Sequence, residues 1–71
     1  MDHLTELRLT AIVQELVGDA EIYGLTANKD ESEIQARIFS DGAPYLFSFT
    51  QDPGTGKYEV TVIQPLGQQK L

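Results

Sequence analysis

The segment Asp52-Pro53-Gly54-Thr55-Gly56-Lys57 is the part of the chain that comes closest to a known chemical motif, because glycine followed by lysine occurs in phosphate-binding loops. The full motif needs a glycine at position 51 and a serine or threonine at position 58, where this chain has Gln51 and Tyr58. The segment also precedes a predicted strand, so no helix N-terminus would face a bound phosphate. We therefore interpret it as a hairpin turn.

A second candidate is the oxygen-rich stretch that contains Asn28, Asp30, Glu31 and Glu33. Carboxylate and amide oxygens are the ligands that calcium prefers, but the spacing here does not fit the loop of an EF-hand. We interpret the stretch as a solvated acidic turn between two strands. The sequence predicts no metal site and no cofactor.

Residues that could transfer protons or attack a substrate are few. His3 is the only side chain whose ordinary pKa lies near neutrality, and it stands close to the end of the sequence. The carboxylates of Glu15, Asp19 and Glu21 cluster in the sequence, but no pattern places them in a cleft. The chain has no cysteine and no Gly-x-Ser-x-Gly elbow. We therefore expect that the chain is not an enzyme.

The charge of the chain argues against two classes of partner. Five basic and eleven acidic residues give a formal net charge of −6, which repels nucleic-acid phosphates and anionic lipids. No apolar run approaches the length of about 20 residues that spans a membrane. We expect a cytoplasmic protein that binds neither nucleic acid nor membranes. The six aromatic residues, which could otherwise suggest a base-stacking platform, are expected mainly in the core.

The elements that must position these groups follow from a change in hydrophobic period. Apolar residues recur at helical spacing between residues 3 and 17, with Asp2 as the expected N-cap and Gly18 as the expected C-cap. The helix has two apolar faces. The broad face contains Leu9, Ile12, Val13, Leu16 and Val17, and the narrow stripe contains Leu4, Leu7 and Ala11.

Beyond the helix, apolar and polar residues alternate, which predicts four strands at about residues 20–27, 33–40, 45–50 and 57–63. Residues 64–71 are expected to form a polar tail. Short connections favour antiparallel neighbours, so we predict an α+β fold in a single domain, residues 1–71, with the N-terminal helix packed on a four-stranded meander (αββββ).

The alternation also assigns the strand residues to two faces of the sheet. We expect the helix to cover the face that contains Ile34, Ala36, Ile38, Tyr45, Phe47, Phe49, Tyr58, Val60 and Val62, with Leu25 or Ile22 from the first strand. Phe39, Leu46 and Ile63 then lie on the opposite, open face. One helix is a small cover for four strands, so part of the aromatic face is expected to stay open unless another chain covers it.

These expectations favour a small non-catalytic protein–protein interaction domain, an adaptor or regulatory subunit that forms a homodimer. The dimer would use one of two apolar surfaces, either the helix stripe of Leu4, Leu7 and Ala11 or the open-face residues Phe39, Leu46 and Ile63.

Two alternatives stay open. The first is an acidic inhibitor or nucleic-acid mimic that blocks a basic groove of a larger protein, which would require one continuous acidic surface from Glu15, Asp19, Glu21, Asp30, Glu31 and Glu33. The second is a subunit or small-ligand binder whose site is completed by another chain.

Overall fold

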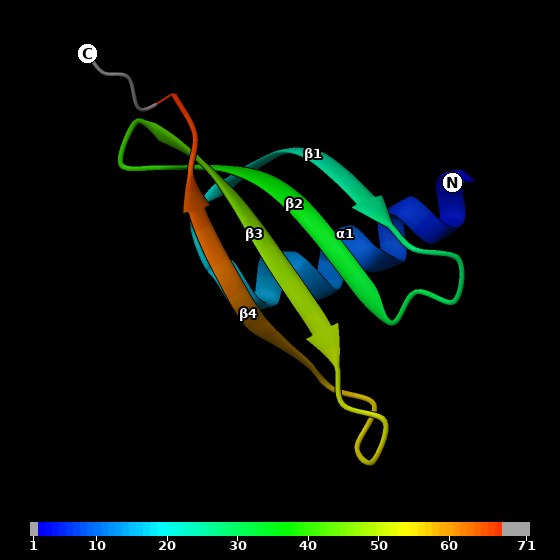
Figure 1. The fold of residues 1–71 in the computed structure, drawn as a ribbon. Helices are drawn as coiled ribbons and strands as arrows, with labels where there is room; N and C mark the ends of the chain where they lie inside the picture. Colours follow the sequence, from blue (N-terminus) through cyan, green and yellow to red (C-terminus); the bar gives the residue numbers. More distant parts are fainter. Residues whose placement is uncertain (1, 68–71) are drawn as a thin grey trace.

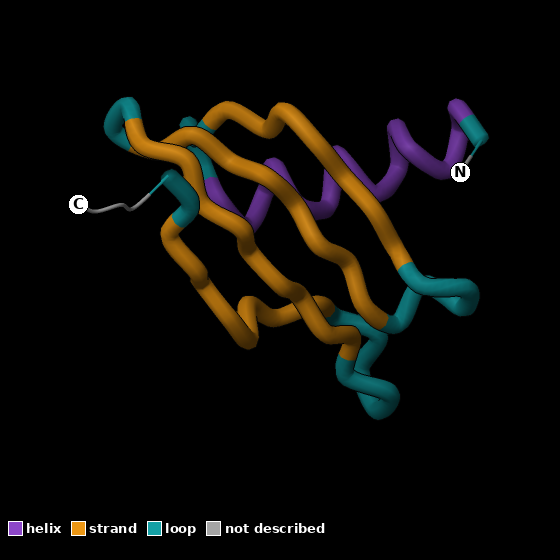
Figure 2. Tube along the Cα trace, turned by 45° about the horizontal axis from the view of Figure 1, so that its top comes forward, coloured by secondary structure: helices purple, strands orange, loops and turns teal. Residues whose placement is uncertain are grey.

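The computed structural model describes residues 2–67, which form one helix and four strands: α1 (His3–Val17), β1 (Glu21–Ala27), β2 (Glu33–Ser40), β3 (Ala43–Gln51) and β4 (Tyr58–Pro65). The strands make one antiparallel sheet in the order β1-β2-β3-β4, which confirms the predicted αββββ meander (Figure 1). Figure 2 shows α1 as a second layer on one face of this sheet. Of the predicted polar tail, Gln64 and Pro65 belong to β4 and residues 68–71 lie outside the described residues.

The ends of α1 are capped as the sequence predicts. The Asp2 carboxylate accepts a hydrogen bond from the Thr5 backbone N–H at 2.8 Å, which satisfies one of the free N–H groups of the first turn. Gly18 has a φ of 72°, a left-handed value that favours glycine, and its N–H donates to the Gln14 carbonyl.

The turn between β2 and β3 is tighter than the sequence analysis expects. Asp41 and Gly42 have φ angles of 54° and 76°, and a two-residue turn with positive φ at both positions matches the twist of a hairpin. Ala43 and Pro44 therefore belong to β3, where Pro44 pairs with Phe39. Pro65 likewise lies inside β4, which tolerates proline because it is an edge strand.

The core lies between α1 and the two central strands. Six apolar side chains are fully buried there: Leu9, Val13, Ile34, Ala36, Ile38 and Phe49. α1 crosses behind the sheet diagonally, from the end of β1 towards β4 (Figure 1). The helix therefore covers the middle of one sheet face and leaves part of β4 without cover. We call the face toward α1 the helix side and the other the open face.

A bulge in β4 corrects the predicted facing of its last residues. Phe49 pairs with Val60 and Ser48 pairs with Val62, so Thr61 is an extra residue between them. One extra residue exchanges the two faces for everything beyond it. Ile63, predicted on the open face, therefore pairs with Phe47 on the helix side, whereas Val62, predicted on the helix side, lies on the open face.

A second bulge in β1 settles the alternative between Leu25 and Ile22. The register passes from the Ile22–Ile38 pair to the Gly24–Arg37 pair, which leaves Tyr23 as the extra residue. Both Ile22 and Leu25 consequently lie on the helix side and pack against the core. The Tyr23 ring instead contacts the Phe39 ring, with a centroid distance of 4.7 Å.

The burial of the central strands predicts unequal costs for two neighbouring aromatic residues. Phe49→Ala should lower the free energy of unfolding by about 3–5 kcal/mol because it removes a fully buried ring. Phe47→Ala should cost clearly less because Phe47 is only partly buried. Urea unfolding followed by circular dichroism measures both values, and equal losses would contradict the described core.

Candidate functional site

The glycine-rich segment between β3 and β4 is a hairpin turn, as the sequence analysis expects. The Asp52 carboxylate accepts from the Gly54 N–H at 2.9 Å, and the backbone groups of Asp52 bond to those of Gly56 and Lys57. The segment leads into β4 and not into a helix. Its N–H groups are thus used within the turn, which is not the arrangement of a phosphate-binding loop.

The oxygen-rich turn between β1 and β2 also uses its polar groups internally. The Asn28 side-chain oxygen accepts from the Glu33 N–H at 3.0 Å, and the Asp30 carboxylate accepts from both the N–H and the hydroxyl of Ser32. These bonds from Ser32 lower the pKa of Asp30 below its ordinary value. Within residues 2–67 no three histidine or acidic side chains gather in an arrangement that could hold a metal ion.

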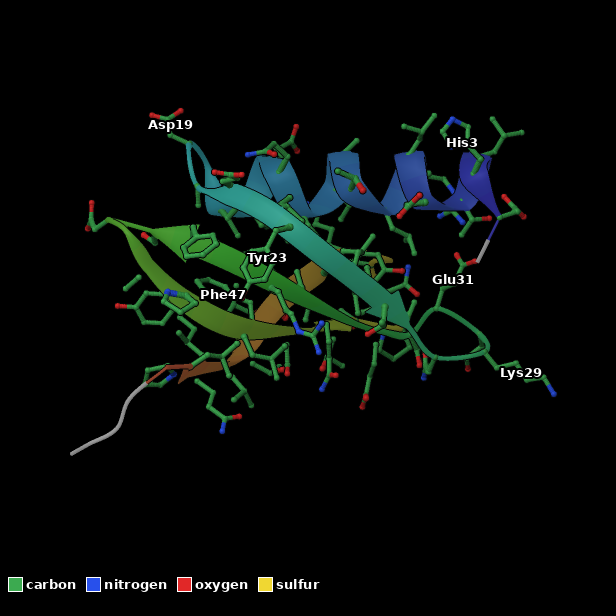
Figure 3. The ribbon with its side chains drawn as sticks, turned by 90° about the horizontal axis from the view of Figure 1, so that it is seen from above. His3, Asp19, Tyr23, Lys29, Glu31 and Phe47 are labelled. Atoms are coloured by element: carbon green, nitrogen blue, oxygen red, sulfur yellow. The ribbon has the colours of Figure 1, made fainter. Side chains whose placement is uncertain are left out.

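The remaining acidic candidates fall into two groups. Glu15, Asp19 and Glu21 lie where α1 leads into β1. Asp30 and Glu31 lie in the turn between β1 and β2, and Glu33 is the first residue of β2. Figure 3 shows Asp19 and Glu31 at opposite ends of the molecule, with His3 on the outer side of the helix, away from the sheet. The six carboxylates therefore do not form the continuous acidic surface that a nucleic-acid mimic would need.

The least covered apolar area on the helix side consists of Leu16, Val60 and Ile63, which we call the β4 patch. These side chains are 43%, 39% and 55% exposed. Val60 and Ile63 share this face because the bulge at Thr61 brings Ile63 round to it. Leu16 belongs to the predicted core face of α1, but it remains exposed because α1 ends beside β4 with nothing beyond it (Figure 1).

A groove of about 460 Å³ adjoins the β4 patch, between α1 and the turn that leads into β4. Its lining combines apolar side chains with charges of both signs. The lining residues are Arg8, Ile12, Glu15, Leu16, Gln51, Gly56, Lys57 and Tyr58. Its lining contains no cysteine, histidine or serine; its ionisable side chains are those of Arg8, Glu15, Lys57 and Tyr58.

Beside this groove a polar network joins α1 to the turn between β1 and β2, and joins that turn to β4. The Arg8 guanidinium pairs with the Glu31 carboxylate, and the Tyr58 hydroxyl donates to the Glu31 backbone carbonyl. Partial burial, reinforced by the nearby Glu31 charge, raises the pKa of Tyr58 above its ordinary value. The hydrogen bond and charge of Glu31 raise the pKa of Arg8, which therefore stays charged.

The structure separates the six predicted interaction residues into three places. Leu4, Leu7 and Ala11 are exposed on the side of α1 opposite the buried Leu9 and Val13, as the periodicity predicts. Phe39 and Leu46 lie on the open face of the sheet, where Phe39 is exposed and Leu46 half-buried. Ile63 lies on the other face, in the β4 patch.

Sequence reasoning did not single out Leu16, Val60, Val62 and Tyr23 as surface residues. Strict alternation assigned Val60 and Val62 to the core, and no residue type in β1 or β4 marks where a bulge falls. One weak signal was present. The β4 segment keeps apolar residues at three nearly consecutive positions, Val60, Val62 and Ile63, which is more than one covered face can use.

Two further findings concern membrane-spanning helices and known proteins. Among residues 2–67 the model contains no helix with the length and apolar character needed to cross a bilayer. Comparison of the chain with models of known protein families, with curated proteins and with solved structures finds no match. The function must therefore be argued from the surfaces themselves.

The network around Glu31 predicts a pH-dependent effect of Tyr58→Phe. Removing the hydroxyl should lower the free energy of unfolding by about 1 kcal/mol at neutral pH. Because folding raises the pKa of Tyr58 above 10.0, its protonated form contributes stability that is present below that pH and is lost as the pH rises through the folded-state pKa.

The difference between the wild type and Tyr58→Phe should accordingly shrink above pH 10.0. Urea unfolding at a series of pH values measures it. A difference that stayed constant through this range would show that the Tyr58 hydroxyl is not held as described.

Proposed function

We propose that this chain is a small protein–protein interaction domain, an adaptor or regulatory subunit of the cytoplasm, which forms a homodimer and catalyses no reaction of its own. The observation that carries the proposal is the β4 patch. Its three side chains are exposed, Val60 and Ile63 share one face of β4, and Leu16 also lines the groove. Groups of exposed apolar side chains mark interaction surfaces more often than single ones do.

The backbone edge of β4 is a poorer interface than this patch. β4 contains the Thr61 bulge, the charged Glu59 and a terminal Pro65, which are three devices that prevent another strand from pairing with an edge. Tyr23 forms a bulge in the other edge strand, β1. Association through side chains on a sheet face is therefore favoured over extension of the sheet.

The size and charge of the area suit a second copy of the chain. A stable interface buries about 800 Å² on each partner, which is about one sixth of the 4912 Å² of accessible surface. The β4 patch would need the adjoining groove to reach that area. The groove has Glu15 on its helix wall and Lys57 on its turn wall, so a two-fold axis allows each Lys57 to meet the Glu15 of the other copy.

Adjacent residues of β4 provide a matched test of this surface. Ile63 and Val62 are 55% and 52% exposed and lie on opposite faces of the same strand. We expect Ile63→Asp to convert the dimer into a monomer, because a charge at the centre of an apolar interface is left unpaired. Val62→Asp should leave the dimer intact. The molar mass is measured by light scattering over a wide concentration range.

Leu7→Asp serves as a third variant, because Leu7 lies in the helix stripe. Leu7→Asp should also leave the dimer intact. If this variant were a monomer, the dimer interface would lie on the helix stripe of α1 and not on the β4 patch. A wild-type chain that remains monomeric at all concentrations would remove the homodimer from the proposal. Circular dichroism of each variant verifies that the fold persists.

A further inference from the structure

The open face of the sheet contains a glycine that the fold does not require. Gly24 lies inside β1 and does not have a positive φ angle, so its backbone would accept any L-residue. A Cβ atom there would lie 3.4 Å from the Arg37 Cδ, which is an ordinary contact with a flexible side chain. Glycine in a strand weakens it, and it often marks a bulge, such as the one at Tyr23 next to Gly24, or a place where a ligand or another backbone approaches closely.

Gly24 is one of the residues that line a hollow of about 160 Å³ in the open face. Ligand pockets for small molecules usually have about 300–1,000 Å³, so this hollow has the size for one side chain of another protein. Three of the side chains that line it can donate hydrogen bonds, namely those of Arg37, Gln35 and Thr26. The side chains of Leu46 and Leu66 are apolar.

Arg37 gives the hollow its charge. It is the only basic residue in the four strands. The one ion pair among residues 2–67 joins Arg8 to Glu31, so Arg37 has no carboxylate partner within these residues. A guanidinium binds a carboxylate through two parallel hydrogen bonds. Among the described residues Arg37 is therefore an exposed guanidinium that is available to pair with a carboxylate of another molecule.

Aromatic side chains border the same end of the face. Phe39 follows Arg37 by two residues on β2, and its ring contacts the ring of Tyr23. Tyr23 is the extra residue of the β1 bulge. Tyrosine, arginine and phenylalanine are enriched in protein interfaces, and tyrosine and arginine dominate their binding energy. The hollow thus combines a cation, hydrogen-bond donors and apolar walls.

We propose that this hollow binds an acidic side chain, Asp or Glu, of a partner protein, with Arg37 as its counter-ion. The apolar residues on either side of that acidic residue pack on the Tyr23–Phe39 pair and on Leu46 and Leu66. The site lies on the face opposite the β4 patch, so it does not depend on the proposed homodimer.

Selection of a random peptide library displayed on phage, with the intact immobilised chain as target, tests this proposal. Peptides enriched on the wild type should share an Asp or Glu flanked by apolar residues. Their affinity should fall about tenfold or more for Arg37→Gln, which loses a charge-assisted pair, and for Gly24→Val, which fills the hollow without changing charge. Lys29→Gln removes the same charge in the turn between β1 and β2, outside both proposed surfaces, and should leave binding unchanged.

Three results would overturn the proposal. The first is that the enriched peptides contain no acidic residue. The second is that the peptides bind the wild type and Gly24→Val with equal affinity. If Gly24→Val does not fold, Gly24→Ala replaces it as the milder substitution. The third is competition of free acetate with the peptides at equal concentration, which would indicate a site for small acids.

The molar mass of Arg37→Gln separates this proposal from the homodimer. An unchanged molar mass is expected, and a dimer that dissociates in Arg37→Gln would indicate that a second copy, and not a partner protein, occupies the hollow. If peptide selection fails while Ile63→Asp still yields a monomer, only the inference about Arg37 is lost.

Discussion

The structure depends on the contact between one helix and a sheet that is wider than it. Leu9 and Val13 of α1 pack against Ile34, Ala36 and Ile38 of β2 and Phe49 of β3. Among residues 2–67 these six are the buried apolar side chains. A helix of fifteen residues is about 22 Å long and about 10 Å wide, whereas strands are spaced by about 4.8 Å. A single helix can therefore seal the centre of a four-stranded sheet but not both of its edges.

Because α1 runs diagonally across the sheet, it leaves the two edges of the sheet covered to different extents. Its first turns are held at the β1–β2 turn by the pair between Arg8 and Glu31, and Tyr58 reaches the same residue from β4. The strand at that far edge has no buried residue at all. Exposed Val60 and Ile63 are thus a consequence of geometry, since any orientation of one helix would leave some apolar residues of this sheet in contact with water.

Local signals in the sequence were sufficient to predict the helix and the strands, but not to predict which face of the sheet every strand residue occupies. Asp2 and Gly18 mark the ends of the helix because capping acts within one turn, and the alternation in β2 identifies Ile34, Ala36 and Ile38 as core. The bulges at Tyr23 and Thr61 depend on hydrogen bonds to neighbouring strands, which no single segment encodes. Thr61 is stabilised across the sheet, where its hydroxyl donates to the Ser48 carbonyl. Once one such residue is inserted, the facing of every later residue in the strand is exchanged, and this is why Ile63 and Val62 were assigned to the wrong faces.

The two faces of the sheet differ in chemistry, and this difference constrains how the domain could associate. The helix side offers apolar residues with charges of both signs, which suits a symmetric contact, whereas the open face offers one unpaired guanidinium beside aromatic rings. Two copies with −6 each would carry a formal charge of −12, which repels a strongly acidic protein at long range. Screening in physiological salt limits that repulsion to about 8 Å. The attraction between Arg37 and a carboxylate therefore depends on the charges within about this distance of it in the complex, and much less on the net charge of the partner.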